Sequence, residues 1–232
     1  MDDTTEKILL SIVSILFGLI AGQGWRLTQT WWNNRRLKKS LLTELEDIRH
    51  RLSQMADGYA RSLQFYAHKV THSTFPAKLS HPVYLKHYTD VFLKLSHAQR
   101  NSYELIHNMV EPLNRVIDIE RVIDIEANLI TKFSKEYDED LFEKWGNTLK
   151  AQYHNIHLLW WHINYHLNNS DSPNLIEMHP FVQKHLAQNT ENISKQIIKI
   201  LSDAKKFSRE ELYGKYDEVI YTAKVKKKEE ND

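Results

Sequence analysis

The sequence predicts an all-α protein in which an N-terminal single transmembrane helix continues into a cytoplasmic bundle of about five to six helices. The first observation is one uncharged apolar run near the N-terminus. The second is a series of apolar stripes that step by three or four residues, the period of amphipathic helices. The third is a scarcity of strand and turn signals, because only three of the six glycines follow the apolar run and no Asn-Gly or Pro-Gly dipeptide occurs.

The apolar run extends from Ile8 to Trp25 and contains no charged residue. As a helix it is about 27 Å long, which is just enough to cross a bilayer. A cleaved signal peptide is disfavoured, because the chain starts with acidic residues and Leu19 occupies the position where a cleavage site before Ala21 needs a small residue. We therefore expect residues 1–32 to form an uncleaved anchor, with a buried helix of a soluble protein as the alternative.

The flanks of this run indicate its orientation. Tryptophans cluster at its end, where amphipathic rings prefer the headgroup layer, and positive charges follow them. The predicted interface residues are Trp25, Arg26, Trp31, Trp32, Arg35, Arg36, Lys38 and Lys39. Because positive residues stay on the cytoplasmic side, we expect a bacterial inner-membrane protein with its N-terminus outside, its bundle in the cytoplasm and anionic headgroups as a partner.

Small residues recur every four positions within the run, at Ser14, Gly18 and Gly22. Such spacing lets two helix backbones approach closely in lipid, so the anchor is predicted to self-associate into a homo-oligomer. The alternative is that glycine and serine are simply common in transmembrane helices.

Residues 33–223 are expected to form the bundle. A stripe from Leu37 to Val70 predicts a long helix, either a coiled-coil seam or one member of a bundle, and the loop 71–82 follows it. Further helices are predicted over 83–110, 113–136, 138–167 and 181–206, with Pro112 kinking or ending the first of them. The tandem repeat RVIDIE at 115–126 has apolar residues on several sides, which predicts a central buried helix.

The C-terminal end is expected to differ from the bundle. Ser208 and Glu211 have the spacing of a capping box for a short last helix, and residues 224–232 are predicted to be a disordered charged tail. Residues 40–223 carry a net charge of −3, which disfavours nucleic acid as a partner.

One candidate for chemistry is a histidine-rich segment. His154 and His157, and likewise His162 and His166, would share a helix face and could supply pairs of ligands to a metal ion. The alternative is an aromatic packing face, and no other cofactor is predicted. The pair Glu104 and His107 also has the spacing of a di-iron motif, which needs further acidic ligands.

A second candidate is Arg100-Asn101 followed by His107. This pattern resembles the Arg-Asn to His motif of HEPN ribonucleases, which are small all-α proteins that often dimerise. The resemblance covers eight residues. It implies that Arg100 would steady a phosphate and that His107 would act as a general acid–base.

The function expected from these patterns is non-enzymatic. With no cysteine, no Gly-x-Ser-x-Gly elbow and no phosphate-binding glycine loop, the corresponding enzyme classes are excluded. We expect a membrane-anchored sensor, interaction or membrane-effector protein, of toxin or defence type if the anchor is active, with an unidentified cytoplasmic protein partner. The ribonuclease and the histidine-ligated metal protein remain the alternatives.

Overall fold

The computed structural model describes five α-helices and one short 3₁₀ helix, and no β-strand occurs within this described part of the chain. The predicted all-α class is therefore confirmed. The backbone is described for residues 3–70, 76–133, 139–175, 179–208 and 211–212. Side chains of residues 3–16, 19, 20, 120 and 123–133 lie outside the description, as does the predicted tail 224–232.

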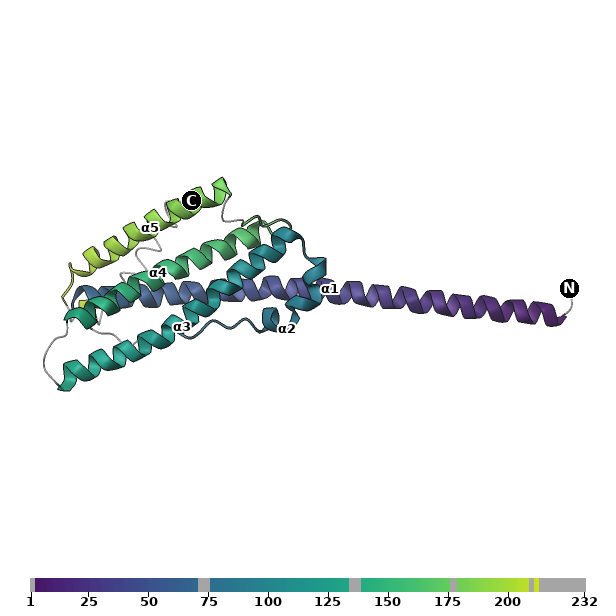
Figure 1. The fold of residues 1–232 in the computed structure, drawn as a ribbon, viewed down its shortest axis with the longest axis horizontal. Helices are drawn as coiled ribbons and strands as arrows, with labels where there is room; N and C mark the ends of the chain where they lie inside the picture. Colours follow the sequence, from purple (N-terminus) through teal and green to yellow (C-terminus); the bar gives the residue numbers. More distant parts are fainter. Residues whose placement is uncertain (1–2, 71–75, 134–138, 176–178, 209–210, 213–232) are drawn as a thin grey trace. The chain divides into compact units, whose positions relative to one another are not determined.

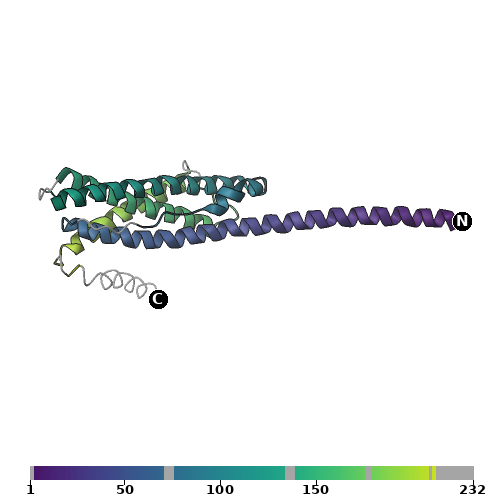
Figure 2. The ribbon, with the colours of Figure 1, turned by 90° about the horizontal axis from the view of Figure 1, so that it is seen from below.

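Helix α1 runs without interruption over Asp3–Ala67 (Figure 1), which confirms the predicted continuous helix. It contains no proline, and its C-terminal half has one buried apolar face with steps of three or four residues. The buried members of this face are Leu41, Leu45, Ile48, Leu52, Met55, Tyr59 and Leu63. The unbroken course of α1 is also visible from below (Figure 2).

The N-terminal part of α1 has a different environment. Every residue from Ala21 to Asn33 is exposed. Within the described residues, no helix holds a stretch long and apolar enough to cross a membrane. Most side chains of the predicted span Ile8–Trp25 lie outside the description, so the membrane anchor stays a prediction.

The prediction of one helix over 83–110 is wrong. The region contains α-helix α2, a short 3₁₀ helix η1 and the start of α-helix α3. Helix α2 covers Pro82–Val91, the 3₁₀ helix η1 covers Phe92–Lys94, and α3 begins at His97. A capping box explains the new start: Gln99 N donates to Ser96 Oγ, and Ser96 N donates to Gln99 Oε1. This reciprocal pair satisfies two backbone donors that a helix start would otherwise leave free.

Of the two effects predicted for Pro112, a kink or an end of the helix, the end does not occur, because α3 covers His97–Phe133 and includes Pro112. A proline inside a helix leaves the carbonyl four residues earlier without its usual donor. Here that residue is Asn108, and both Asn108 and Pro112 are exposed, so water can solvate the free carbonyl.

Most of the described side chains of the repeat RVIDIE at 115–126 are exposed, against the prediction of a central buried helix. Ile117 in the first copy is buried, but Ile119 and Val122 are exposed. The side chains of residues 120 and 123–126 lie outside the description.

Helix α4 covers Glu139–Asn168 and α5 covers Pro180–Ala204, close to the predicted bounds. Helix α3 packs along α4, and α4 packs along α5. Beyond α5, Glu211 N donates to Ser208 Oγ and Ser208 N donates to Glu211 Oε2, so the predicted capping box is confirmed. The remainder of the predicted last helix lies outside the described residues.

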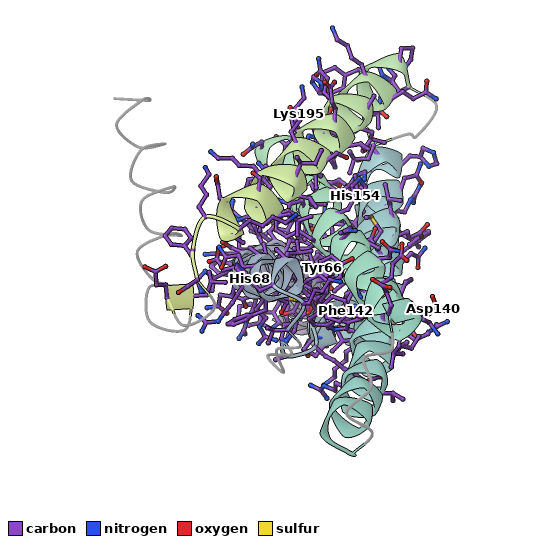
Figure 3. All side chains as sticks on the ribbon, turned by 90° about the vertical axis from the view of Figure 1, so that its left-hand side faces the viewer. Tyr66, His68, Asp140, Phe142, His154 and Lys195 are labelled. Carbon is purple, nitrogen blue, oxygen red and sulfur yellow. The ribbon has the colours of Figure 1, made fainter. Side chains whose placement is uncertain are left out.

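Tyr66 joins the end of α1 to α4. Its ring stacks on Phe142 with centroids 5.0 Å apart (Figure 3). The same ring meets Trp145 edge-on at 6.0 Å. The ring also occupies the place where a side chain at Gly146 would stand, since a Cβ there would lie 2.0 Å from Cε2 of Tyr66. A side chain at Gly146 would therefore displace the half-buried Tyr66 ring, whereas the backbone conformation of Gly146 is one that any residue can adopt.

The chain forms two compact units. The N-terminal unit comprises Met1–Glu44 with Pro82–Leu95, and the bundle unit comprises Leu45–His81 with Ser96–Asp232. In the N-terminal unit, the buried Glu44 carboxylate accepts from the backbone N–H groups of Val83 and Tyr84 at 2.6 and 2.9 Å, which caps the start of α2. Lys38 donates to the carbonyl of Lys94 at the end of η1. The segment α2–η1 is thus held at both ends on residues 38–44 of α1.

Candidate functional site

The bundle unit contains a histidine cluster, formed by His81, His107 and His166 with Ser102 and Tyr103, in which all members except the half-buried His81 are buried. The His81 and His107 rings stack with centroids 5.0 Å apart, and their Nδ1 atoms share a hydrogen bond of 3.0 Å. Ser102 Oγ and His166 Nδ1 are 2.6 Å apart, and the Tyr103 ring lies 4.3 Å from His166. Three parts of the chain therefore meet at this cluster.

Helix periodicity places the cluster members inside. Tyr103, His107 and Val110 share the buried face of α3, because they are spaced by four and three residues. On α4, His162 and His166 are one turn apart and are both buried. These histidines follow the same three- and four-residue spacing as the buried aliphatic residues of α3 and α4. The imidazole rings therefore occupy positions where a helix usually has an aliphatic side chain.

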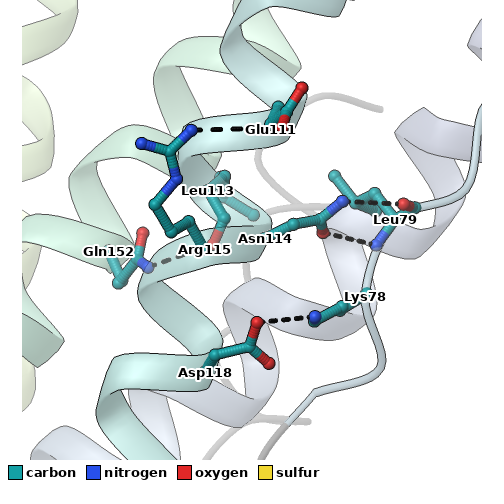
Figure 4. Close-up of polar contacts among 8 residues, drawn as sticks. All are labelled: Lys78, Leu79, Glu111, Leu113, Asn114, Arg115, Asp118 and Gln152. Atoms are coloured by element: carbon teal, nitrogen blue, oxygen red, sulfur yellow. Dashed lines mark hydrogen bonds and ion pairs between the residues drawn. The ribbon is translucent and has the colours of Figure 1, made fainter.

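His81 is positioned by an extended segment, residues 76–81, which we call the strap. Asn114 of α3 holds it by accepting from Leu79 N at 2.8 Å and donating to Leu79 O at 2.9 Å (Figure 4). Lys78 adds an exposed ion pair with Asp118 at 2.6 Å. These contacts fix the backbone two residues before His81 against α3.

Burial keeps the imidazoles neutral. The pKa of His107 is lowered from 6.5 to about 3, first by burial and then by the neighbouring His81 and His166. Burial alone lowers the pKa of His162 and of His166 to about 4. At neutral pH these rings are therefore uncharged core groups, and such low pKa values do not suit proton transfer near pH 7.

The residues of the ribonuclease hypothesis are not brought together as a surface site. Arg100 is half-buried, Asn101 donates from Nδ2 to His97 Nε2 at 3.1 Å, and His107 is buried beside His81. A general acid–base must reach the proton that it transfers, and here the His107 ring lies inside the bundle. The ribonuclease remains a prediction, and this burial weighs against it.

The four predicted metal ligands also diverge. His162 and His166 lie on the buried face of α4, whereas His154 contacts Thr190 of α5 through Nε2 at 3.3 Å and the His157 ring lies 4.5 Å from Tyr153. Among the described residues, no group of three or more His, Asp or Glu side chains is arranged to hold a metal ion. The packing interpretation of this segment therefore has the better support.

Comparison with known proteins gives no further guide, because no family model, curated protein or solved structure matches the chain. Function has to be argued from the residues themselves.

The second candidate region is the exposed part of α1. Trp25 and Trp32 are 71% and 66% exposed, and Trp31 and Leu27 are also exposed. The Trp31 and Trp32 rings meet edge-on at 6.3 Å, and the Arg35 guanidinium lies 5.5 Å above the Trp31 ring. Three exposed tryptophans within eight residues, followed by basic residues, are a large apolar surface for a monomer in water.

Several contributing residues were missed by the sequence interpretation. His81 and Ser102 carry no local signal, because their partners lie 26 and 64 residues away. The role of Glu44 could have been predicted, because it is three residues after Leu41 and so lies on the same buried helix face. A carboxylate on a buried face needs a hydrogen-bond donor.

Proposed function

We propose that the chain is a single-pass membrane protein, anchored by the N-terminal part of α1, whose bundle serves as a cytoplasmic interaction module. The observation that carries the proposal is the exposed tryptophan group, Trp25, Trp31 and Trp32, on an unbroken helix directly after the uncharged run. Such rings are typical of the membrane interface, where one edge meets lipid and the other meets water.

The proposed orientation follows from charge. Arg26, Arg35, Arg36, Lys38 and Lys39 come after the span without an intervening acid, whereas the seven residues before the span have a net charge of −2. The positive side stays in the cytoplasm, so the bundle unit lies there and the N-terminus lies outside.

A binding role is favoured over catalysis in the bundle. His107, the acid–base candidate, is buried with a pKa lowered to about 3. Buried neutral imidazoles are suited to fixing one packing arrangement, which is what a module that presents a surface to a partner needs.

We also propose that the anchor self-associates through Gly18 and Gly22. Apart from the neighbouring backbone of α1 itself, an added Cβ at either glycine would meet no described atom within 4 Å, so the described structure leaves room for a second helix at this face. Replacing Gly18 by leucine should reduce the oligomer size measured in detergent, and an unchanged size would contradict self-association.

The test of the anchor places a charge at the centre of the predicted span. Phe17, which is exposed, is replaced by arginine, and the protein is followed through alkaline extraction of membranes. A charge at the centre of a span opposes insertion by about 2.5 to 3.5 kcal/mol, so Phe17→Arg should move the protein from the membrane pellet to the extract.

Ile198→Arg is the matched control, because Ile198 is a similarly exposed apolar residue on α5. It should leave the protein in the pellet, as should Phe17→Leu. If wild type and Phe17→Arg are extracted equally, the proposed anchor is wrong.

A further inference from the structure

The outer face of α2–η1 carries two unusually exposed leucines. Leu93 is 84% exposed, the highest value among the large apolar side chains that the structure describes, and Leu85 is 72% exposed. The opposite face is already used, since Tyr88, Val91 and Leu95 are buried. The segment therefore has an apolar inner face in the fold and two apolar side chains on its outer side that no described residue covers.

The two leucines lie at different distances from the tryptophans of α1. The start of α2 contacts Glu44 and the end of η1 contacts Lys38. Lys38 and Glu44 are six residues apart on α1, which is about 9 Å along a helix. Trp32 comes six residues before Lys38, which adds about 9 Å in the same direction. Leu93 is thus at the end of the segment nearer to the tryptophans, and Leu85 is near the other end.

The surroundings of these leucines are basic. Residues 21–44 and 82–95 contain seven Lys and Arg against two acids. Of the two acids, Glu44 is buried and caps α2, and the Asp90 carboxylate is hydrogen-bonded to the His87 ring at 3.1 Å. Lys86 and Lys94 stand beside the exposed leucines, so the outer face combines apolar and positive groups.

We propose that the outer face of α2–η1 lies on the anionic headgroup layer of the membrane that holds α1, with Leu93 inserted and Lys86 and Lys94 at lipid phosphates. This inference rests on the proposed function, because it places a second membrane contact beside the anchor. Leucine with flanking lysines matches an anionic lipid surface, which accepts an apolar side chain and attracts positive charge.

Continuity with the predicted interface favours lipid over a protein partner. The same short stretch of α1 that carries Arg35, Arg36, Lys38 and Lys39 also holds α2–η1. A surface adjoining an interfacial belt, with the same combination of apolar and basic groups, is in place to meet the same headgroups.

The test uses the natural absence of cysteine. Leu93→Cys and Leu85→Cys variants of the full chain are labelled with an environment-sensitive fluorophore and reconstituted in vesicles of phosphatidylcholine with phosphatidylglycerol. A lipid with a headgroup quencher is then added. Gln29→Cys, between Trp25 and Trp31, reports the proposed interface of α1, and Ile198→Cys on α5 reports background quenching.

The expected result is strong quenching and a blue-shifted emission at positions 29 and 93, weaker quenching at 85, and background quenching at 198. In vesicles of phosphatidylcholine alone, the signal at 93 should fall while that at 29 is kept. Quenching at 29 with only background quenching at 93 would overturn this inference and leave the anchor intact, with the leucines open to a protein partner. Background quenching at both positions would overturn the proposed function itself.

Discussion

The N-terminal unit and the bundle unit use polar aromatic residues in opposite ways. In the N-terminal unit, Trp25, Trp31 and Trp32 are exposed on α1, whereas in the bundle unit His107, His162 and His166 are buried. The charges differ as well, with eight Lys and Arg against five acids in the N-terminal unit and 23 against 25 in the bundle unit.

This difference shows that residue type alone does not assign a role. Tryptophan is usually a core residue and histidine a surface or catalytic residue, and here both are reversed. The three histidines are buried because they lie on the inner faces of α3 and α4, whereas residues 21–33 of α1, with all three tryptophans, are exposed on every side. The contrast predicts that the bundle unit responds to pH and packing changes, and that the N-terminal unit responds to charge and lipid.

The largest expected effect is a loss of bundle stability in mild acid. In the unfolded chain the three buried histidines titrate near 6.5, but in the fold their pKa values are lowered to between about 3 and 4. Their contribution is complete above pH 6.5 and is lost as the pH falls toward 4, because the unfolded chain then binds more protons. Each contributes up to about 1.4 kcal/mol per pH unit, so the loss by about pH 5 is on the order of 5 kcal/mol.

Urea unfolding at a series of pH values measures this loss. His162→Leu should remove about a third of it, since one of three similar groups no longer titrates. His50→Gln, at an exposed position of α1, should keep the wild-type profile. An unchanged profile in His162→Leu would contradict the buried neutral state of His162.

The next effect compares one substitution at two glycines. Gly146→Ala should destabilise the bundle by about 1 to 3 kcal/mol, because the added Cβ meets a Tyr66 ring that is itself packed on Phe142 and Trp145. Gly58→Ala should stabilise by about 0.5 to 1 kcal/mol, because its Cβ meets nothing and alanine is the better helix former. Thermal unfolding of both variants measures these changes as shifts of the unfolding midpoint. Equal shifts of the same sign would contradict the contact between Tyr66 and Gly146.

The smallest of these effects concerns the strap. Asn114→Ala removes both hydrogen bonds to Leu79 and should cost about 1 to 2 kcal/mol while speeding hydrogen exchange at residues 76–81. Lys78→Ala removes only the exposed pair with Asp118 and should cost less than about 1 kcal/mol, with exchange close to wild type. Equal exchange in the two variants would show that Asn114 does not hold the strap.

The sequence predicts those parts of the fold that repeat with a helical period. The buried face from Leu41 to Leu63 follows from spacing, and α4 and α5 have the expected bounds. The break before α3 was missed, although Ser96 and Gln99 have the Ser-x-x-Gln spacing of a capping box. Pro112 does not end α3, and the exposed position of Asn108 and Pro112 lets water solvate the carbonyl that the proline leaves without a donor.

The candidate site was less accessible to sequence reasoning. His107 stood out by its spacing to Arg100, but its burial and its contact with His81 depend on the strap, which packs through Asn114. Contacts between a loop and a helix carry no period, so no local pattern reports them. The exposure of Leu93 likewise depends on the turn at η1, which tertiary contacts set.

The membrane topology tests the central claim most directly. Because the chain has no cysteine, Thr5→Cys and Ser202→Cys each give one reactive site, at the start of α1 and near the end of α5. A membrane-impermeant maleimide is added to intact cells and again after lysis. We expect Thr5→Cys to be labelled in intact cells and Ser202→Cys only after lysis. If Thr5→Cys is also labelled only after lysis, the chain does not span the membrane in the proposed orientation.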